Sequence, residues 1–139
     1  MRRMRLALTG EDAHWTRAVR GAVRSVNAIA DCQIDWVEAK DGPADHDTPS
    51  RASIPTVLLV DATAAPDIEA LVREYVRAGW REIVVVAANP NWREAHAILQ
   101  RASARDYWPK SYDVDGIRWR LAELLREVTG AEVDGKETP

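Results

Sequence analysis

The sequence predicts an α/β fold: a doubly wound, five-stranded parallel sheet with the strand order 2-1-3-4-5 and a weak or missing second helix. Two observations carry this prediction. Thr56–Asp61 and Glu82–Ala88 are short, β-branched runs that are apolar nearly throughout, which is typical of strands buried on both faces. Strand-like runs also alternate with helical patterns along the chain, which favours helices on both faces of a parallel sheet, joined by right-handed crossovers.

The other three strands are shorter or less apolar. The first is Arg5–Thr9, with Gly10 opening the loop that follows, and the second is Asp31–Ala39. The fifth is Asp106–Trp108. Between the second and third strands, Lys40–Ser53 is rich in Asp, Gly, Pro and Ser and has no apolar period. We therefore expect a loop or at most a short helical turn there, where the pattern would otherwise place the second helix.

Four amphipathic helices are predicted, because apolar residues recur at helical spacing between the strands. Gly79 is a C′ residue that ends the second of them, and Asn89 or Asn91 caps the third. Asp113 or Asp115 caps the last. The four predicted segments are Ala13–Ile29, Asp67–Gly79, a helix that Asn89–Asn91 opens and that runs to about Ala102, and Asp113–Val128.

Length and composition limit the classes of protein to consider. A chain of 139 residues is ordinarily one domain, here residues 1–128, followed by a polar tail or linker at residues 129–139. The net charge is −3 without a basic stripe, which disfavours nucleic-acid binding. No apolar run approaches the length that spans a membrane. Cys32 is the single cysteine, so no internal disulfide can form, and a cytoplasmic location is expected.

Polar side chains follow three of the predicted strands. Glu11 and Asp12 follow the first strand, Asp61 ends the third, and Lys110 follows the fifth. In such sheets the chemistry lies beyond the carboxyl ends of the strands. We therefore expect Glu11, Asp61 and Lys110 to converge there, with Asp12 at the rim. Carboxylates facing a lysine suit Mg²⁺ and a phosphoryl group, since hard oxygen atoms hold the metal and the ammonium offsets the added negative charge.

Two segments carry a resemblance to a known family. They are Ile54–Asp61, an apolar strand ending on an aspartate, and Asp106–Lys110, a short strand ending before a lysine. At their separation in a five-fold strand–helix pattern, the chain resembles a response-regulator receiver domain, which has the flavodoxin-like fold of the chemotaxis regulators. The resemblance extends from Arg5 to about Leu125.

The resemblance assigns roles at the carboxyl edge of the sheet. Asp61 matches the family's phosphoacceptor, and Lys110 matches the lysine that contacts the phosphoryl group. Aligned from the first strand, the family's metal-binding acidic pair falls on Gly10 and Glu11, so its first acid is lost. A shift of one residue would place Glu11 and Asp12 there instead, and the sequence leaves both registers open.

The residues that transmit the signal in the family are altered. The hydroxyl that ends strand four falls on Ala87, and alanine cannot donate a hydrogen bond to a phosphoryl oxygen. Tyr107 matches the aromatic switch residue of strand five. Without the hydroxyl, the group that would link a phosphoryl group on Asp61 to the rotamer of Tyr107 is absent.

Structural roles explain several of these residues equally simply. Asp61 can cap the following loop or helix, and Lys110 can be an ordinary solvated lysine. Glu11 and Asp12 precede a helix, whose positive N-terminal end favours acids. A flavin or nucleotide site is disfavoured, since no glycine-rich phosphate loop follows the first strand.

The sequence therefore predicts a receiver-like signalling module of two-component or phosphorelay type that is not an enzyme. We expect a pseudo-receiver, which acts by protein–protein interaction without regulated phosphorylation. The alternative is a working receiver that a histidine kinase phosphorylates on Asp61 with Mg²⁺; the first function requires no cofactor. Expected partners are a signalling protein, a linked output domain, or a second copy bound through the family's fourth and fifth helices. If the pocket is eroded, Gly10→Asp with Ala87→Thr should restore Mg²⁺ binding.

Overall fold

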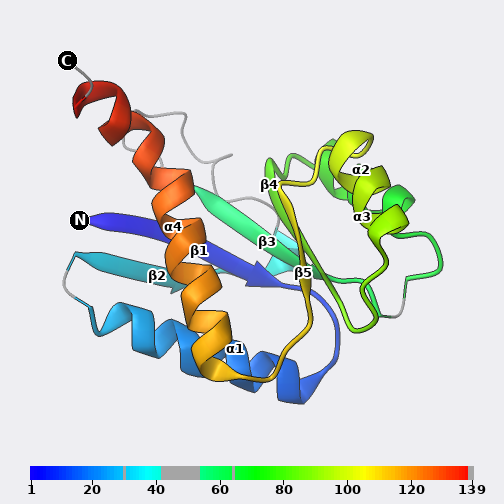
Figure 1. Ribbon diagram of the computed structural model, residues 1–139, viewed down its shortest axis with the longest axis horizontal. Coiled ribbons are helices and arrows are strands. Elements are labelled where there is room, and N and C mark those ends of the chain that lie inside the picture. The colour runs from blue at the N-terminus through cyan, green and yellow to red at the C-terminus, as the bar shows by residue number, and fades with distance from the viewer. Residues whose placement is uncertain (30, 42–53, 64, 138–139) are drawn as a thin grey trace.

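The chain forms one parallel sheet whose strands alternate with helices (Figure 1). The structure is a computed structural model that describes residues 1–29, 31–41, 54–63 and 65–137. The elements are β1 (Arg2–Leu8), α1 (Ala13–Asn27), β2 (Cys32–Trp36), the 3₁₀ turn η1 (Ala39–Asp41), β3 (Thr56–Asp61), α2 (Ile68–Arg77), β4 (Glu82–Ala87), α3 (Trp92–Gln100), β5 (Asp106–Pro109) and α4 (Val114–Glu137).

The sheet has the predicted topology. Its five strands lie in the order β2-β1-β3-β4-β5, and each neighbouring pair is parallel. Leu8 pairs with Leu59, and Asp61 pairs with Val86, so β1, β3 and β4 end at a common edge. Ala87 pairs with Pro109 at the same edge. The carboxyl ends of these strands therefore meet where the site was expected.

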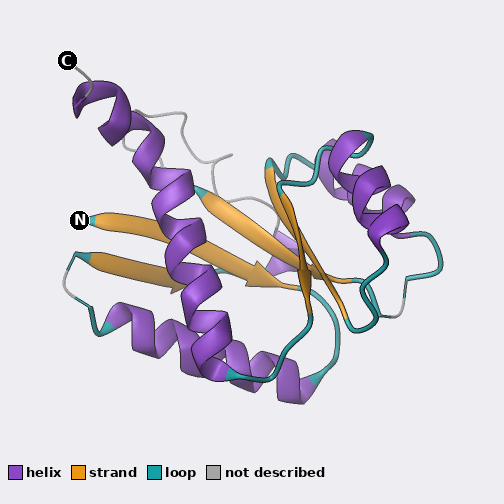
Figure 2. Cartoon of the chain, in the orientation of Figure 1, coloured by secondary structure: helices purple, strands orange, loops and turns teal. Residues whose placement is uncertain are grey.

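Two hydrophobic cores lie on opposite faces of the sheet, which explains why the interior residues of β3 and β4 are all apolar. In β3, Val57 and Leu59 belong to the core beneath α1 and α4, whereas Leu58 and Val60 belong to the core beneath α2 and α3. Successive side chains of a strand point to opposite faces, so a strand covered on both faces needs apolar residues at every position. Figure 2 shows the helices in these two layers.

Local capping sets the ends of the helices. Asp12 caps α1, and Asp67 caps α2 through the amide of Ala70. Asn91 is the cap of α3, which resolves the choice between Asn89 and Asn91. Gly79, with a φ of +108°, follows the last residues of α2 as the predicted C′ glycine.

The last helix is longer than predicted. The expected end at Val128 is wrong, because α4 continues to Glu137. Polarity alone does not end a helix, and no proline interrupts this segment before Pro139. Thr129 fits into the helix, since its hydroxyl donates to the carbonyl of Leu125 one turn earlier. The proposed division between a domain and a tail at residue 128 stays a prediction.

The strand bounds differ from expectation in part, whereas the described start of the long connection agrees with it. β1 begins at Arg2 instead of Arg5, because Arg2–Leu6 pair with β2, and Arg3 forms an ion pair with Asp35 of β2 at 2.8 Å. β2 is confined to Cys32–Trp36. Of the predicted loop Lys40–Ser53, the first residues form η1, and residues 42–53 lie outside the described part of the chain.

Candidate functional site

Asp61 and Lys110 form a shielded ion pair at the carboxyl edge of the sheet. The Lys110 Nζ lies 2.8 Å from Asp61 Oδ2, and only 3% of the lysine side chain and 6% of the aspartate side chain are exposed. Lys110 is placed by backbone pairing, since its amide donates to the carbonyl of Ala87. Lys110 is therefore the shielded ion-pair partner of Asp61 and not a solvated surface lysine.

Asp12, not Glu11, is the second acid of this site. The Lys110 Nζ lies 2.8 Å from Asp12 Oδ2 as well. The Oδ1 of Asp12 accepts hydrogen bonds from the amides of His14 and Trp15, which caps α1. One carboxylate thus performs both roles that the sequence left open, since it caps the helix and faces the lysine.

Glu11 does not join the group. Its side chain is exposed, and neither a hydrogen bond nor an ion pair of this residue occurs within the described part of the chain. The expectation that Glu11 meets Asp61 and Lys110, with Asp12 at the rim, is therefore corrected. Neither of the two registers places both of its residues in the pocket as acids. Glu11 is exposed to water, and only Asp12 contacts Lys110.

Gly10 accounts for this arrangement. It has a φ of +95°, a conformation that L side chains rarely adopt. A Cβ atom built on Gly10 would lie 2.8 Å from the Cβ of Asp61 and 2.9 Å from its Oδ2. The chain therefore passes directly against Asp61 and leaves no room for a side chain. A side chain at position 10 requires one of the two segments to move, which counts against the expectation that Gly10→Asp with Ala87→Thr restores Mg²⁺ binding.

Further polar groups complete the site, and sequence reasoning did not identify them. The Tyr112 hydroxyl donates to Asp12 Oδ2 at 2.6 Å, and the Thr63 hydroxyl lies 3.4 Å from the Lys110 Nζ. The Thr9 hydroxyl accepts the backbone N–H of Asp61 at 3.0 Å. The Lys110 ammonium thus has three oxygen neighbours for its three N–H groups. Thr63 lies two residues after Asp61, and Tyr112 lies two residues after Lys110. This proximity in the sequence is the feature that could have identified them.

The side chains at the strand-four and strand-five positions lie outside this network. Ala87 is buried and brings only a methyl group to the edge. The Tyr107 hydroxyl bonds instead to the start of α3, accepting from Asn91 N at 3.1 Å and donating to Glu94 Oε1 at 2.9 Å. No hydrogen bond between the described residues connects Tyr107 to Asp61.

The charges of the site stabilise one another. Hydrogen bonds from Lys110 and Tyr112 and the amide of Trp15 hold the pKa of Asp12 far below its usual value. Burial alone would raise the pKa of Asp61, but hydrogen bonds from Lys110 and Thr63 outweigh it and lower that pKa. Burial would lower the pKa of Lys110, and the two carboxylates outweigh this and raise it. All three groups are charged at neutral pH.

These shifts predict acid sensitivity. Because the two carboxylates have lowered pKa values, their stabilising effect is present above the pKa of the unfolded chain, about 4. It is lost as the pH falls through their folded values. The raised pKa of Lys110 keeps its contribution intact below the usual lysine value. We expect the free energy of unfolding to fall between about pH 5 and about pH 2, measured by urea denaturation.

A matched variant assigns this acid sensitivity to the pocket. In Asp61→Asn the part of the slope that belongs to Asp61 disappears, so the dependence on pH flattens. Asp31→Asn is the control, because Asp31 is exposed and has a positive φ that asparagine tolerates. An equal slope in wild type and Asp61→Asn would contradict the assignment.

The described residues do not offer a ready metal site. Nowhere within residues 1–29, 31–41, 54–63 and 65–137 are three or more His, Cys, Asp or Glu side chains grouped to hold a metal ion. Asp12 and Asp61 each direct one carboxylate oxygen at the Lys110 ammonium. That ammonium stands between the two acids as their cation, so the arrangement does not fit Mg²⁺ while Lys110 stays in place.

The fold can be compared with known structures. A response regulator receiver protein from Pseudoalteromonas atlantica matches with a TM-score of 0.50 and 14% identity, over 91% of this chain and 98% of that chain. A proposed CpaE2 pilus assembly protein from Sinorhizobium meliloti 1021 matches with a TM-score of 0.54 and 13% identity, over 86% and 97%. No family model matches the sequence, and neither does a curated protein. At these identities the likeness concerns the fold, and in that respect the predicted resemblance to a receiver domain is confirmed.

Proposed function

We propose that this protein is a pseudo-receiver: a signalling module that acts by binding another protein and does not depend on phosphorylation of Asp61. The observation that carries the proposal is the placement of Lys110, whose ammonium lies 2.8 Å from both Asp12 and Asp61. An internal cation thus lies between the carboxylates that a working receiver would offer to Mg²⁺ and offsets one of their two negative charges. The module has no reaction to catalyse in this proposal.

Two further features support the same function. Gly10 stands against Asp61 where the family has an acid, so the ligand number available to a metal is reduced. Ala87 has no hydroxyl to follow a phosphoryl group. The site would therefore bind a metal weakly. A phosphoryl group on Asp61 would have little effect on Tyr107.

The exposed surface favours binding through helices. The outer edge of β2 is closed by Asn27, whose side-chain amide bonds to both the N–H and the carbonyl of Ile34. At β5, the Tyr107 amide bonds to the Asp106 side chain. Such protection disfavours addition of a partner strand. Trp92 on α3 and Trp119 on α4, in contrast, are 76% and 69% exposed, and exposed tryptophan is enriched at protein interfaces.

We infer that a partner protein, or a second copy of the chain, binds α3 and α4, which follow the fourth and fifth strands. These are the helices that correspond to the fourth and fifth of the family's pattern. The described residues contain no helix that is both long and apolar enough to cross a bilayer. A signalling protein partner or a linked output domain is consistent with this surface.

Incubation with phosphoramidate and Mg²⁺, read by intact-protein mass, tests the proposal. We expect most of the protein to keep its unmodified mass, because the metal finds no free carboxylate pair and the Oδ2 of Asp61 is engaged by the Lys110 ammonium. Light scattering before and after treatment should give the same molar mass. A receiver that is phosphorylated under identical conditions is the positive control, and Asp61→Asn shows any modification elsewhere.

The alternative function makes the opposite prediction. A working receiver would gain one phosphoryl group on nearly every molecule, only with Mg²⁺ present and not in Asp61→Asn. Such a result, together with a change in oligomeric state, would replace the pseudo-receiver by a receiver that a histidine kinase phosphorylates.

A further inference from the structure

The hydroxyl group of Tyr107 completes the cap of a neighbouring helix. Asn91 begins α3 as its N-cap, and its side-chain Oδ1 accepts the amides of Arg93 and Glu94. The backbone N–H of Asn91 donates to the Tyr107 hydroxyl at 3.1 Å. A residue of β5 thus satisfies a donor at the start of the helix that precedes it in the chain.

Glu94 occupies the third position of this helix. In a capping box, the glutamate at that position reaches back and accepts the N–H of the N-cap residue directly. The first half of the box is present here as the bond from the Glu94 amide to Asn91 Oδ1. In the second half, the Tyr107 hydroxyl stands between the two groups, accepting from Asn91 and donating to Glu94 Oε1 at 2.9 Å.

We propose that this bridged capping box is a two-state element that sets the position of Tyr107. When the Tyr107 hydroxyl leaves, the Glu94 carboxylate accepts the Asn91 N–H directly, and α3 stays capped. Departure of the tyrosine therefore leaves no unpaired donor at the helix terminus, so the aromatic ring can change rotamer at little cost. The state of Tyr107 is controlled from α3 and not from Asp61.

The chemistry of the hydroxyl supports both states. A phenol can donate and accept at the same time. Burial, with the Glu94 carboxylate nearby, raises the pKa of Tyr107, so the hydroxyl stays protonated and able to donate at neutral pH. The inference does not rest on the pseudo-receiver proposal, because it involves no group of the Asp61 pocket.

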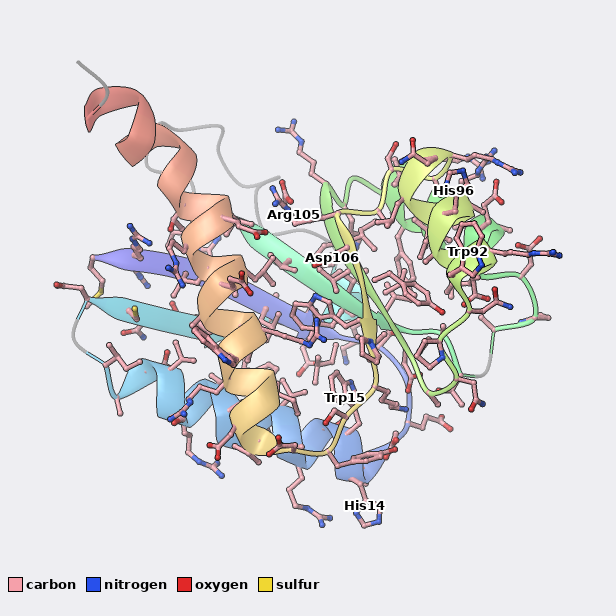
Figure 3. All side chains as sticks on the ribbon, in the orientation of Figure 1. His14, Trp15, Trp92, His96, Arg105 and Asp106 are labelled. Atoms are coloured by element: carbon pink, nitrogen blue, oxygen red, sulfur yellow. The ribbon has the colours of Figure 1, made fainter. Side chains whose placement is uncertain are left out.

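The first turns of α3 would report the change at the surface. Trp92 follows Asn91 directly and packs edge to face on His96, with 6.2 Å between ring centroids. Figure 3 places both side chains on the helix layer opposite α1, which carries His14. This exposed aromatic pair thus lies in the turns that the cap begins, whereas no residue of the Asp12–Lys110–Asp61 group takes part in the cap.

A double-variant experiment tests the two-state cap. The readout is the exchange rate of the Asn91 amide hydrogen, measured by NMR in the full chain. Tyr107→Phe should leave this rate nearly unchanged, since Glu94 takes over as acceptor. Glu94→Ala should likewise have a small effect, since Tyr107 still accepts. In the double variant both acceptors are gone, and exchange should be faster by roughly tenfold.

Controls separate this from general destabilisation. Tyr75→Phe removes a half-buried hydroxyl from α2, outside the cap, and should leave the Asn91 rate unchanged. The Arg93 amide, which bonds to Asn91 Oδ1, is the internal reference for an intact helix start in every variant. Full loss of protection in Tyr107→Phe alone, additive losses in the double variant, or no loss in it would each overturn the proposal.

Discussion

Lys110→Met should lower the free energy of unfolding by roughly 3 kcal/mol, the largest loss for any side chain of the site. The variant leaves Asp61, whose side chain is 6% exposed, without its cation. When one partner of a shielded ion pair is removed, the desolvation free energy of the remaining charge is no longer compensated. We take the lower end of the usual range, because Asp12 is more open to water, with 21% of its side chain exposed. Urea denaturation at neutral pH measures the loss.

Two companion variants show whether the loss belongs to the ion pair. Lys110→Met combined with Asp61→Asn should recover most of the stability, since no uncompensated charge remains at Asp61. Lys40→Met removes an exposed lysine of η1 and should change stability by less than about 0.5 kcal/mol. Millimolar Mg²⁺ should stabilise Lys110→Met more than wild type, because the two carboxylates become free to bind a cation. Equal losses in Lys110→Met and the double variant would refute the pairing.

The central strands were predictable because burial on both faces leaves a continuous apolar run. In β4, Ile83 and Val85 pack beneath α2 and α3, while Val84 and Val86 pack beneath α1 and α4. The start of the first strand was harder to predict, because Arg2, Arg3 and Arg5 interrupt its apolar pattern, and Arg3 pairs with Asp35 only across to the neighbouring strand. Cross-strand partners of this kind become visible only when the strands are paired.

The site was predictable only in part, for a physical reason at the end of β1. The approach of Asp61 to Lys110 follows from the strand order, since both residues lie at the same edge of the sheet. Which acid joins them depends on the path of the chain through Gly10. Its φ of +95° directs Asp12, not Glu11, toward the lysine. A sequence shows that glycine permits this conformation, but not that the chain adopts it.

The close approach of Gly10 to Asp61 gives the second large effect. Gly10→Ala should lower the free energy of unfolding by about 2–6 kcal/mol, of which backbone strain supplies about 1–3 kcal/mol and the clash with Asp61 a similar share. The added Cβ would lie 2.8 Å from the Asp61 Cβ, so one of the two segments must move. Gly10→Asp should be at least as destabilising and should show no gain in Mg²⁺ binding.

Two other glycines separate strain from clash. Gly79 also has a positive φ, +108°, but is exposed at the end of α2, so Gly79→Ala should show the strain alone. At Gly21, inside α1, an added Cβ would meet Val114 at 3.6 Å, an ordinary contact. Gly21→Ala should therefore stabilise the protein by about 0.5–1 kcal/mol, because alanine favours a helix. Thermal and urea unfolding of the three alanine variants measure these effects. If Gly10→Ala were no more destabilising than Gly79→Ala, Gly10 would not be in contact with Asp61. The absence of an acid at position 10 would then result from the identity of the residue and not from a lack of space, and Gly10→Asp would supply that acid.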